Sequence, residues 1–375
     1  MLTNQWYVAG EAAAVTTAPV MVRLLGQDLV VFRDATGKLA CLSDICIHRG
    51  AALSRGRTVD GCVECPYHGW RYDRDGRVTK IPAEPDAKIP ARARIDAYPT
   101  VEKYGWIWVF LGDEPEHSRA PIPDMPEYDD PEIRWVRGEW NWRVNYHRAV
   151  ENGLDFAHAP FVHGSTFGDR ERPQISDFSV EEAEWSARSR MIMSVPHRSR
   201  GLWSLGSKKN NPAIRQVEAR PWFHLSGPIV GLELFPREGW RIWLRSAHTP
   251  VDEYTTKSWW LMGRNFMKAK FFDKDTIKRN VKIFAEDAEI IQFLKPELVP
   301  DSLRDELTVK TDGLQVAYRR KVRALEQRGW KVDTAQLEAE FVGRRACSLP
   351  SPGRSDGSFV LQRVPLTSLK QGAAE

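Results

Sequence analysis

The stretches CIHRG, at Cys46 to Gly50, and CPYHGW, at Cys65 to Trp70, decide the fold of the first part of this chain. Each combines one cysteine with one histidine, as Cys-x-His in the first stretch and Cys-x-x-His in the second. Thiolates and imidazoles at such short spacing are typical metal ligands. The glycines and prolines beside them predict two tight turns at the tips of strands. We therefore take the two turns as a candidate metal site.

Three explanations of these turns compete. A zinc site is one, but zinc fingers group Cys with Cys and His with His, whereas each arm here carries one of each. Unrelated structural residues are the second, and the turn-forming glycines and prolines argue against them. The third is a Rieske [2Fe–2S] cluster, in which two cysteines hold one iron and two histidines hold the exposed iron. The full pattern C-x-H-R-G…C-x-Y-H-G-W favours the cluster, with Cys46, His48, Cys65 and His68 as its ligands.

Composition limits the other properties of the protein. A hydrophobic content of 42% and a charged content of 28% are typical of a soluble globular protein. No apolar run is long enough to span a membrane, and the longest, WIWVFL at Trp106 to Leu111, suits a buried strand. The N-terminus lacks the pattern of a secretory signal, and five cysteines are too few for a disulfide framework, so we expect reduced thiols in a cytoplasmic protein. The small net charge of +4 does not indicate nucleic-acid binding.

The organisation of the chain indicates an α+β protein. The first hundred residues read as short strands, and a stretch rich in proline and acidic residues follows. A helical period then runs from Trp140 to His158, strand-like segments run from about Phe178 to Met262, and two long helical patterns come last. We predict an all-β domain at 1–118, a linker at 119–133 and a larger α+β domain at 134–375.

A second candidate site lies in ENGLDFAHAPFVHG, at Glu151 to Gly164, which offers Asp155, His158 and His163. The two histidines are five residues apart, which is about 140° around an ideal helix. They can reach one metal only if the helix ends between them, and Pro160 gives a reason for it to end there. The alternative is a pair of core histidines that bond to the backbone.

The third ligand of this site is predicted in KIFAEDAEIIQFL, at Lys282 to Leu294. One apolar stripe of the predicted helix contains Phe284, Asp287, Ile291 and Leu294. An unpaired carboxylate in an apolar stripe is costly, and a metal would compensate Asp287. Two histidines and one carboxylate form the facial triad of non-haem Fe(II) oxygenases. Glu286 and Glu289 fall outside the stripe, and we expect them to be solvated.

A carboxylate-bridged di-iron bundle is the rival metal site. It requires two Glu/Asp-x-x-His repeats on separate helices. Asp155-x-x-His158 is the only such repeat within the helical patterns of this chain, so the di-iron interpretation fails.

With both sites in place, the chain resembles the oxygenase (α) component of Rieske non-haem iron ring-hydroxylating oxygenases. The resemblance rests on C-x-H…C-x-x-H, on N-x-x-D-x-x-H-x-x-x-x-H and on the late aspartate. The chain length, YGWIWVFLG at Tyr104 to Gly112 and QVAYRR at Gln315 to Arg320 look most like the single-subunit-type branch. That branch holds oxidative demethylases and monooxygenases, with pheophorbide oxygenase-like members nearby.

The resemblance implies a helix-grip catalytic domain, in which a large antiparallel sheet wraps around a helix. It also implies a ring-shaped homotrimer, in which the cluster of one subunit lies close to the mononuclear iron of its neighbour. Asp155 would then act in catalysis by bridging His68 of one chain and His158 of the next. A hydrogen-bonded carboxylate suits this role because it orients a metal-bound imidazole.

The resemblance further implies an enzyme that uses O₂. A ferredoxin or an NAD(P)H-dependent reductase, or both, would supply electrons to the cluster, and the triad would hold the mononuclear Fe(II). The substrate would be a hydrophobic small molecule, aromatic or polycyclic, in a pocket built from the segments Trp203 to Phe235 and Trp240 to Trp260. Hydroxylation, oxidative demethylation and dihydroxylation share the iron and differ in substrate placement, so the sequence leaves these reactions open. It also leaves the substrate-binding residues unknown.

Several arginines crowd the cluster motif, namely Arg49, Arg55, Arg57, Arg71, Arg74 and Arg77. They could dock an acidic electron donor, or they could be ordinary solvated side chains.

Two rival functions belong to other classes. One is a Rieske electron-transfer protein fused to a non-catalytic ligand-binding domain. The other is a zinc-stabilised binding protein without redox chemistry, which would be colourless, whereas a Rieske protein is brown.

Overall fold

A computed structural model describes residues 1–196 and 214–367 of the chain; Trp203, expected near the substrate pocket, lies outside these residues. The chain forms two compact units. The first contains 1–122, 249–253 and the described residues from Arg323 onward, and the second contains 123–248 and 254–322. The boundaries predicted at residues 118 and 134 remain a prediction. In the structure, the described residues from Arg323 onward, which were predicted to belong to the 134–375 domain, pack within the first unit.

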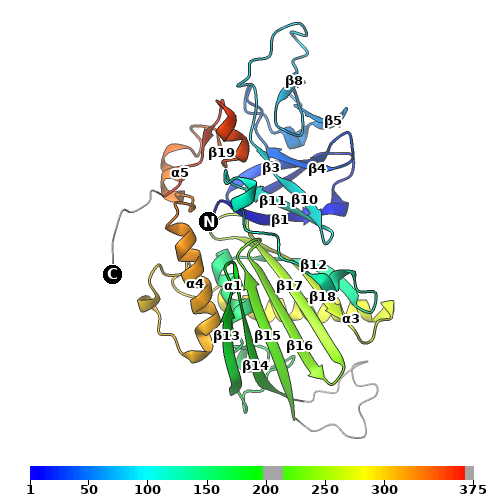
Figure 1. The fold of residues 1–375 in the computed structure, drawn as a ribbon, viewed down its shortest axis with the longest axis vertical. Coiled ribbons are helices and arrows are strands. Elements are labelled where there is room, and N and C mark those ends of the chain that lie inside the picture. The colour runs from blue at the N-terminus through cyan, green and yellow to red at the C-terminus, as the bar shows by residue number, and fades with distance from the viewer. Residues whose placement is uncertain (197–213, 368–375) are drawn as a thin grey trace. The chain divides into compact units, whose positions relative to one another are not determined.

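Small β-sheets form the first unit (Figure 1). One sheet, in the order β1-β11-β10, contains β1 (Gln5–Glu11), β11 (Trp106–Leu111) and β10 (Thr100–Lys103). The next, in the order β2-β3-β4-β9, contains β2 (Val20–Leu24), β3 (Gln27–Arg33), β4 (Leu39–Ser43) and β9 (Ala97–Tyr98). A third contains β5 (Arg57–Val59), β6 (Cys62–Glu64), β7 (Arg71–Tyr72) and β8 (Val78–Lys80). The WIWVFL strand β11 is buried along its whole length, as predicted, because β1 and β10 pair with it on both sides.

The C-terminal part of the first unit contains helix α5 (Thr334–Glu340) and the parallel pair β19 (Cys347–Ser348) and β20 (Gln362–Arg363). A buried ion pair fixes this segment to the sheets. The Asp96 carboxylate, fully buried, accepts hydrogen bonds from the Arg354 guanidinium at 2.7 and 2.8 Å. The hydroxyls of Ser348 and Ser351 donate to the same carboxylate at 2.6 and 2.7 Å. Both oxygens of this buried charge therefore have donors, as its burial requires.

A seven-stranded antiparallel sheet dominates the second unit, in the order β12-β18-β17-β16-β15-β14-β13. Its strands are β12 (Arg134–Trp142), β13 (Ile175–Glu182), β14 (Ser186–Pro196), β15 (Ile214–His224), β16 (Ile229–Arg237), β17 (Trp240–Pro250) and β18 (Thr256–Arg264). The helices are α1 (Tyr146–Leu154), α2 (Ala159–Val162), α3 (Asp273–Ile291) and α4 (Gly313–Glu326), whose last turn belongs to the first unit. The predicted α+β class, with an all-β beginning and a large antiparallel sheet around a helix, is confirmed.

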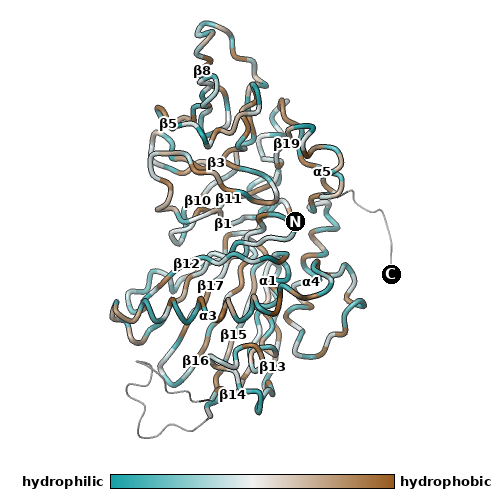
Figure 2. Tube along the Cα trace, turned by 180° about the vertical axis from the view of Figure 1, so that it is seen from behind, coloured by the Kyte–Doolittle hydropathy of each residue, from teal (hydrophilic) through white to brown (hydrophobic). Residues whose placement is uncertain are grey.

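Helix α3 lies across this sheet, and apolar and polar residues alternate along it (Figure 2). Phe284 anchors it. Its ring lies 5.5 Å from that of Trp142, 6.1 Å from that of Trp140 and 6.3 Å from that of Trp260, centroid to centroid. These tryptophans come from the neighbouring strands β12 and β18, so burial of one helix face holds α3 against the sheet.

The helical period read from Trp140 to His158 is wrong at both ends. Trp140 and Trp142 belong to strand β12 and pair with Ser258 and Thr256 of β18, and α1 ends at Leu154. Aromatic residues at alternate positions fit a pleated strand, and pairing with β18 overrides the weaker helical pattern. None of the helices in the described ranges is both long and apolar enough to cross a membrane.

Candidate metal centres

The two Cys/His loops fold alike. In each, the cysteine amide donates to the carbonyl five residues on, at 2.9 Å for Cys46 and 2.8 Å for Cys65. The cysteine carbonyl accepts from the glycine four residues on, Gly50 at 2.8 Å and Gly69 at 3.0 Å. Both glycines have positive φ, 74° and 70°, which a Cβ would strain. The repeated glycine of the motif therefore closes each loop.

The loops separate thiols from imidazoles. Cys46 and Cys65 are each 2% exposed, whereas His48 is half-buried and His68 is exposed. The two imidazole rings lie 4.5 Å apart, centroid to centroid, and Trp70 stacks on His48 at 4.7 Å. The structure thus brings the two loops that carry the four predicted ligands together, with the two cysteines buried and the two imidazole rings nearer the surface.

Tyr72, which the sequence did not single out, supports the inner sulfur. Its hydroxyl lies 3.1 Å from Cys46 Sγ and accepts from the Ile47 amide at 3.2 Å. Burial raises the pKa of Tyr72, so the phenol stays protonated and can donate to a thiolate at Cys46. The only signal in the sequence was the position of Tyr72, two residues after the CPYHGW stretch.

The donor set of the loops fits a [2Fe–2S] cluster better than one zinc ion. A single tetrahedral ion needs all its ligand atoms within about 4 Å of one another. Among the described residues, only His158, His163 and Asp287 form a group of three His, Cys, Asp or Glu side chains whose ligand atoms all lie within 4.8 Å of one another. The Cys/His loops therefore do not form such a group. The Nδ1 atom of His48 is buried and has no hydrogen-bond partner, as expected of a nitrogen reserved for a metal.

His158 and His163 flank the short helix α2. His158 precedes it, His163 follows it, and Pro160 lies in its first turn. Proline is tolerated there because its missing N–H would have no partner in the helix. The expected break is therefore misplaced: α1 ends at Leu154, and Pro160 begins a helix rather than ending one.

The two histidines and Asp287 converge on one point. The Nε2 atoms of His158 and His163 lie 3.2 Å apart, and each is 3.3 Å from Oδ1 of Asp287. Phe284, Asp287 and Ile291 form the predicted buried stripe of α3, although Leu294 is 39% exposed because the helix has ended. The triad is thus assembled from two segments more than a hundred residues apart in sequence.

Glu286 is not solvated, so the expectation for this residue is wrong. Its carboxylate lies 2.9 Å from Nδ1 of His163 and accepts from the Thr166 hydroxyl at 3.0 Å and from Ser165. The turn after His163 covers this side of α3, so only 13% of the Glu286 side chain is exposed. A carboxylate on Nδ1 holds the proton there and leaves Nε2 free as a ligand. The signal available was its position beside Asp287. Glu289 is exposed, as expected.

Asp155 faces the other imidazole less closely, since Nδ1 of His158 is buried and has no hydrogen-bond partner. Its Oδ1 accepts from the Ala157 amide at 2.7 Å, and its Oδ2 lies 3.6 Å from Nδ1 of His158. Burial would lower the pKa of His158, but the carboxylates of Asp155 and Asp287 outweigh burial and raise that pKa to about 9. One third of the Asp155 side chain stays exposed, which leaves it accessible to a second group.

A buried ion network holds helix α1, which ends just before Asp155. Arg319 Nη2 donates to the Glu151 carboxylate at 2.7 Å, and Arg148 Nη1 donates to Glu306 at 3.1 Å. Arg148 also donates to the carbonyls of Pro296 and Leu298 at 2.8 and 3.3 Å. Breaking such a pair leaves an uncompensated buried charge, so the network fixes the position of Asp155.

The triad fits a metal ion. At metal–ligand bonds of about 2.1 Å, neighbouring ligand atoms lie about 3.0 Å apart in octahedral geometry and about 3.4 Å apart in tetrahedral geometry. The observed edges of 3.2–3.3 Å fall in this range. The imidazoles lower the pKa of Asp287 although burial would raise it, so the carboxylate is an anionic donor. The structure brings together no further carboxylate or imidazole on this point among the described residues, which leaves open positions.

An apolar cluster adjoins the triad. It contains Ala159, Met193 and Val217, with the partly buried Phe156, Phe167, Val195 and Leu234 against them. The Phe167 ring also stacks on His163, 4.8 Å between centroids. Small-molecule sites are mostly apolar, so this cluster can line a substrate pocket. Of the two segments expected there, the described part of the first contributes Val217 and Leu234.

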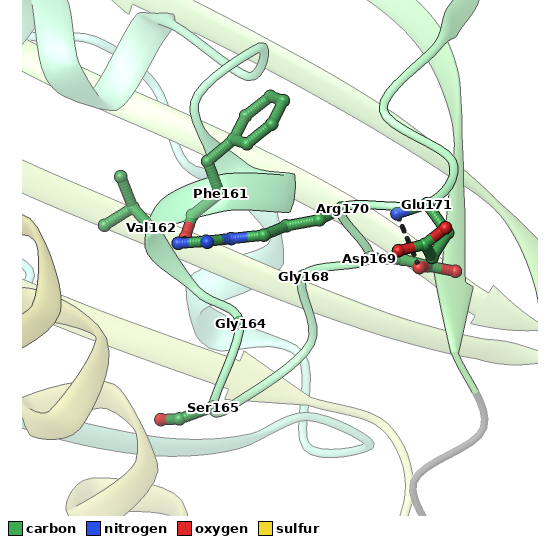
Figure 3. Close-up of a pocket in the computed structure, with 8 residues that line it drawn as sticks. All are labelled: Phe161, Val162, Gly164, Ser165, Gly168, Asp169, Arg170 and Glu171. Carbon is green, nitrogen blue, oxygen red and sulfur yellow. Dashed lines mark hydrogen bonds between the residues drawn. The ribbon is translucent and has the colours of Figure 1, made fainter.

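A separate pocket of about 540 Å³ opens in the turn that follows α2 (Figure 3). Its lining residues are Phe161, Val162, Gly164, Ser165, Gly168, Asp169, Arg170 and Glu171. Arg170 extends back toward α2 and donates to the Phe161 carbonyl at 3.2 Å. No triad residue lines this pocket, so it is not the place where a substrate meets the metal site.

Comparison with known proteins finds relatives for both parts of the chain. Residues 5–99 match the Rieske [2Fe–2S] domain, and residues 142–328 match the vanillate O-demethylase oxygenase C-terminal domain. The toluene-4-sulfonate monooxygenase system iron-sulfur subunit TsaM1 of Comamonas testosteroni is 34% identical, over 80% of this chain and 90% of its own. The methylxanthine N1-demethylase NdmA of Pseudomonas putida is 29% identical, over 82% of this chain and 83% of its own.

The solved structure of NdmA from Pseudomonas putida CBB5 has the same fold. Its TM-score is 0.71 at 25% identity, over 87% of this chain and 91% of that one. The two domain matches cover most of the chain, and these relatives extend over more than three quarters of it. The chain therefore belongs to the Rieske non-haem iron oxygenases.

Proposed function

We propose that Cys46, His48, Cys65 and His68 hold the Rieske cluster and that His158, His163 and Asp287 hold a mononuclear Fe(II). The enzyme then uses O₂ to hydroxylate or oxidatively demethylate a small molecule with a largely apolar body. The observation that carries this proposal is the triangle of two Nε2 atoms and one Oδ1, with a carboxylate behind each histidine. When bound, such an iron supplies open positions at which O₂ is activated.

The chain's own residues supply the positioning. Glu286 lies within hydrogen-bond distance of Nδ1 of His163 and so orients that imidazole, whereas Asp155, 3.6 Å from Nδ1 of His158, acts on the other imidazole through its charge. The apolar cluster around Val217 and Met193 would hold the substrate body and exclude water. The relatives act on methylxanthines and on toluene-4-sulfonate, by their names, which supports a small ring-containing substrate for this chain as well.

The first test counts metals. After anaerobic loading with Fe(II) and desalting, we expect about three irons and two acid-labile sulfides per chain. Oxygen consumption should then depend on substrate. About two irons with two sulfides would leave only the cluster, and the protein would be an electron carrier instead.

The assembly is proposed to be a homotrimer in which the cluster of one chain serves the iron of the next. The exposed third of Asp155 supports this arrangement, since the carboxylate can meet a second imidazole, His68 of a neighbour. Asp155→Asn should leave cluster reduction intact and abolish substrate-dependent turnover. Co-expression of Cys46→Ser and Asp287→Ala chains should restore activity that each variant lacks alone. No recovery in a mixed trimer would contradict transfer between subunits.

The electron donor is proposed to be a ferredoxin or an NAD(P)H-dependent reductase. Acidic side chains already neutralise Arg57, Arg71 and Arg74. Arg49 is exposed beside His48 and has no ion pair within the described ranges, so it is the best candidate for docking an acidic donor. Raised salt and Arg49→Glu should both slow cluster reduction. We place the protein in the cytoplasm because none of its five cysteines forms a disulfide, including Cys41, Cys62 and Cys347, which are not proposed as cluster ligands.

A further inference from the structure

Arg215 lies on the inner face of the large sheet. Side chains alternate along a strand, so Arg215 shares its face with Val217, two residues on, and not with Glu218. Val217 belongs to the apolar cluster beside the triad, and Arg215 pairs across the strands with Val195, a member of the same cluster. Two residues along a strand span about 7 Å. The Cα atom of Arg215 thus lies about 7 Å from that of Val217, a residue of the proposed substrate site.

Arg237 lies on the neighbouring strand, where a register shift between Leu234 and Arg237 interrupts the alternation of β16, so its face is that of its partner on β17. It pairs with Trp240 across β16 and β17, and its guanidinium lies 3.6 Å from the centre of that indole. Trp240 shares its face with Ile242, which pairs with Leu234 of the apolar cluster. Arg215 and Arg237 therefore stand on one face of adjacent strands, at the end of the cluster.

These two arginines differ from the others on these strands. Arg190 and Arg220 pair with Glu218 at 2.9 and 2.6 Å, and Arg241 and Arg245 pair with Glu233. Those ion pairs lie on the opposite face of the sheet, because their residues alternate along the strands with the inner-face residues. In the described ranges, neither Arg215 nor Arg237 has a carboxylate within ion-pair distance, and the Nε atoms of both are buried without a hydrogen-bond partner. The stretch 197–213, outside the described residues, contains no Asp or Glu.

The two positive charges act on each other. Burial and the nearby Arg237 guanidinium both lower the pKa of Arg215 from its ordinary value. Like charges held together in a partly buried place, with unused donors, favour an anion that enters from outside the chain. A planar guanidinium binds carboxylate and sulfonate oxygens through two parallel hydrogen bonds.

We propose that Arg215 and Arg237 form an anion subsite of the substrate pocket and that the substrate is a small aromatic molecule with a carboxylate or sulfonate group. This inference rests on the proposed function, since it assumes that the apolar cluster holds the substrate. The anionic group anchors one end of the molecule, and the ring lies over the cluster. The opposite end of the ring is then the part directed to the triad.

The test compares two probes of nearly equal shape, 4-methoxybenzoate and 4-methoxybenzamide. Their binding to the iron-loaded protein is measured by isothermal titration calorimetry at low salt. We expect the benzoate to bind at least about 10-fold tighter, because charged hydrogen bonds are the stronger ones. Arg215→Gln and Arg237→Gln should each weaken benzoate binding about 10- to 100-fold and change benzamide binding less than about twofold.

Two sets of variants control the result. Arg220→Gln removes an arginine of the same strand that pairs with Glu218, and it should not change either affinity. Arg215→Lys and Arg237→Lys keep the charge and should retain most of the preference. Circular dichroism and the visible cluster spectrum show whether each variant is folded.

Equal affinity for both probes, no detectable binding of the benzoate, or a preference that survives both glutamine variants would overturn the proposal. The iron count separates this failure from that of the proposed function. A protein with two irons that still prefers the benzoate keeps the anion subsite and loses the oxygenase mechanism. A protein with three irons and no preference for the benzoate keeps the oxygenase mechanism and loses the anion subsite.

Discussion

The two metal centres are built in different ways. Each Cys/His loop is closed by hydrogen bonds within a few residues, and both loops lie in a small β-unit between Cys46 and Trp70. The triad instead joins the ends of α2 to Asp287 in the second half of α3, more than a hundred residues later. The first site therefore depends on local turn geometry, and the second depends on how a long helix packs against a sheet.

The largest expected effect separates the two sites completely. Cys46→Ser should remove the cluster, with its visible absorption and both of its irons, and leave the triad able to bind one Fe(II). Asp287→Ala should remove that one iron and leave the cluster spectrum unchanged. Iron and sulfide analysis with visible spectroscopy checks both variants. If either variant lost all three irons, the sites would not be independent.

The packing that builds the triad can be weakened without touching a ligand. Phe284→Ala deletes the ring that contacts three tryptophans of β12 and β18, and it should destabilise the second unit by about 3–5 kcal/mol. Fe(II) binding should weaken with it, while the cluster spectrum stays the same. Denaturant unfolding followed by tryptophan fluorescence measures the change. Phe293→Ala is the matched control, since 71% of that residue is exposed. Loss of the cluster in Phe284→Ala would contradict the local character of the first site.

This difference explains what the sequence could predict. The proposed cluster ligands follow from spacing alone, because the backbone hydrogen bonds that close each loop span four or five residues. Asp287 was predicted from a charge in an apolar stripe, which is a packing argument within one helix. Pro160 was misread because proline ends a helix or begins one, and the choice depends on where α1 stops. The strand at Trp140 was missed because its partner β18 lies far along the chain.

Glu286 shows the same limit at one residue. Its place off the apolar stripe predicted exposure, but the turn at Ser165 and Thr166 folds over it, and no helical pattern contains that turn. The order Arg148, Glu151, Arg319 and Glu306 gives no warning of a buried ion network either, because its members come from three separate segments. Side chains that support a site from another segment are where pattern reasoning fails.

Glu286→Gln tests the support of the triad. The amide keeps the shape but can no longer attract the Nδ1 proton of His163 as a carboxylate does, so Fe(II) affinity should fall about 10- to 100-fold. Competition with a coloured chelator measures the affinity, and Co(II) substitution gives a spectrum of the site that a change in fold stability alone would not shift.

Glu289→Gln is the matched control for this experiment. It lies on the same helix, its side chain is exposed, and its affinity should equal that of the unaltered protein. An unchanged affinity in Glu286→Gln would mean that the contact with His163 is incidental and that the triad depends on packing alone.

The smallest effect belongs to the cluster. Tyr72→Phe removes the hydroxyl that lies 3.1 Å from Cys46 Sγ and leaves the ring in the core. Hydrogen bonds to the sulfurs stabilise the more negative, reduced cluster, so the midpoint potential should fall. Loss of about 1 kcal/mol of hydrogen-bond energy corresponds to a fall on the order of 50 mV for a one-electron couple. Redox titration followed by visible absorption measures it, with Tyr67→Phe, an exposed ring, as control. A fall of equal size in both variants would assign the effect to the surface of the loop rather than to the bond at Cys46. A fall in Tyr72→Phe alone, with Fe(II) affinity at the triad unchanged, would show that each centre is tuned by contacts within its own unit.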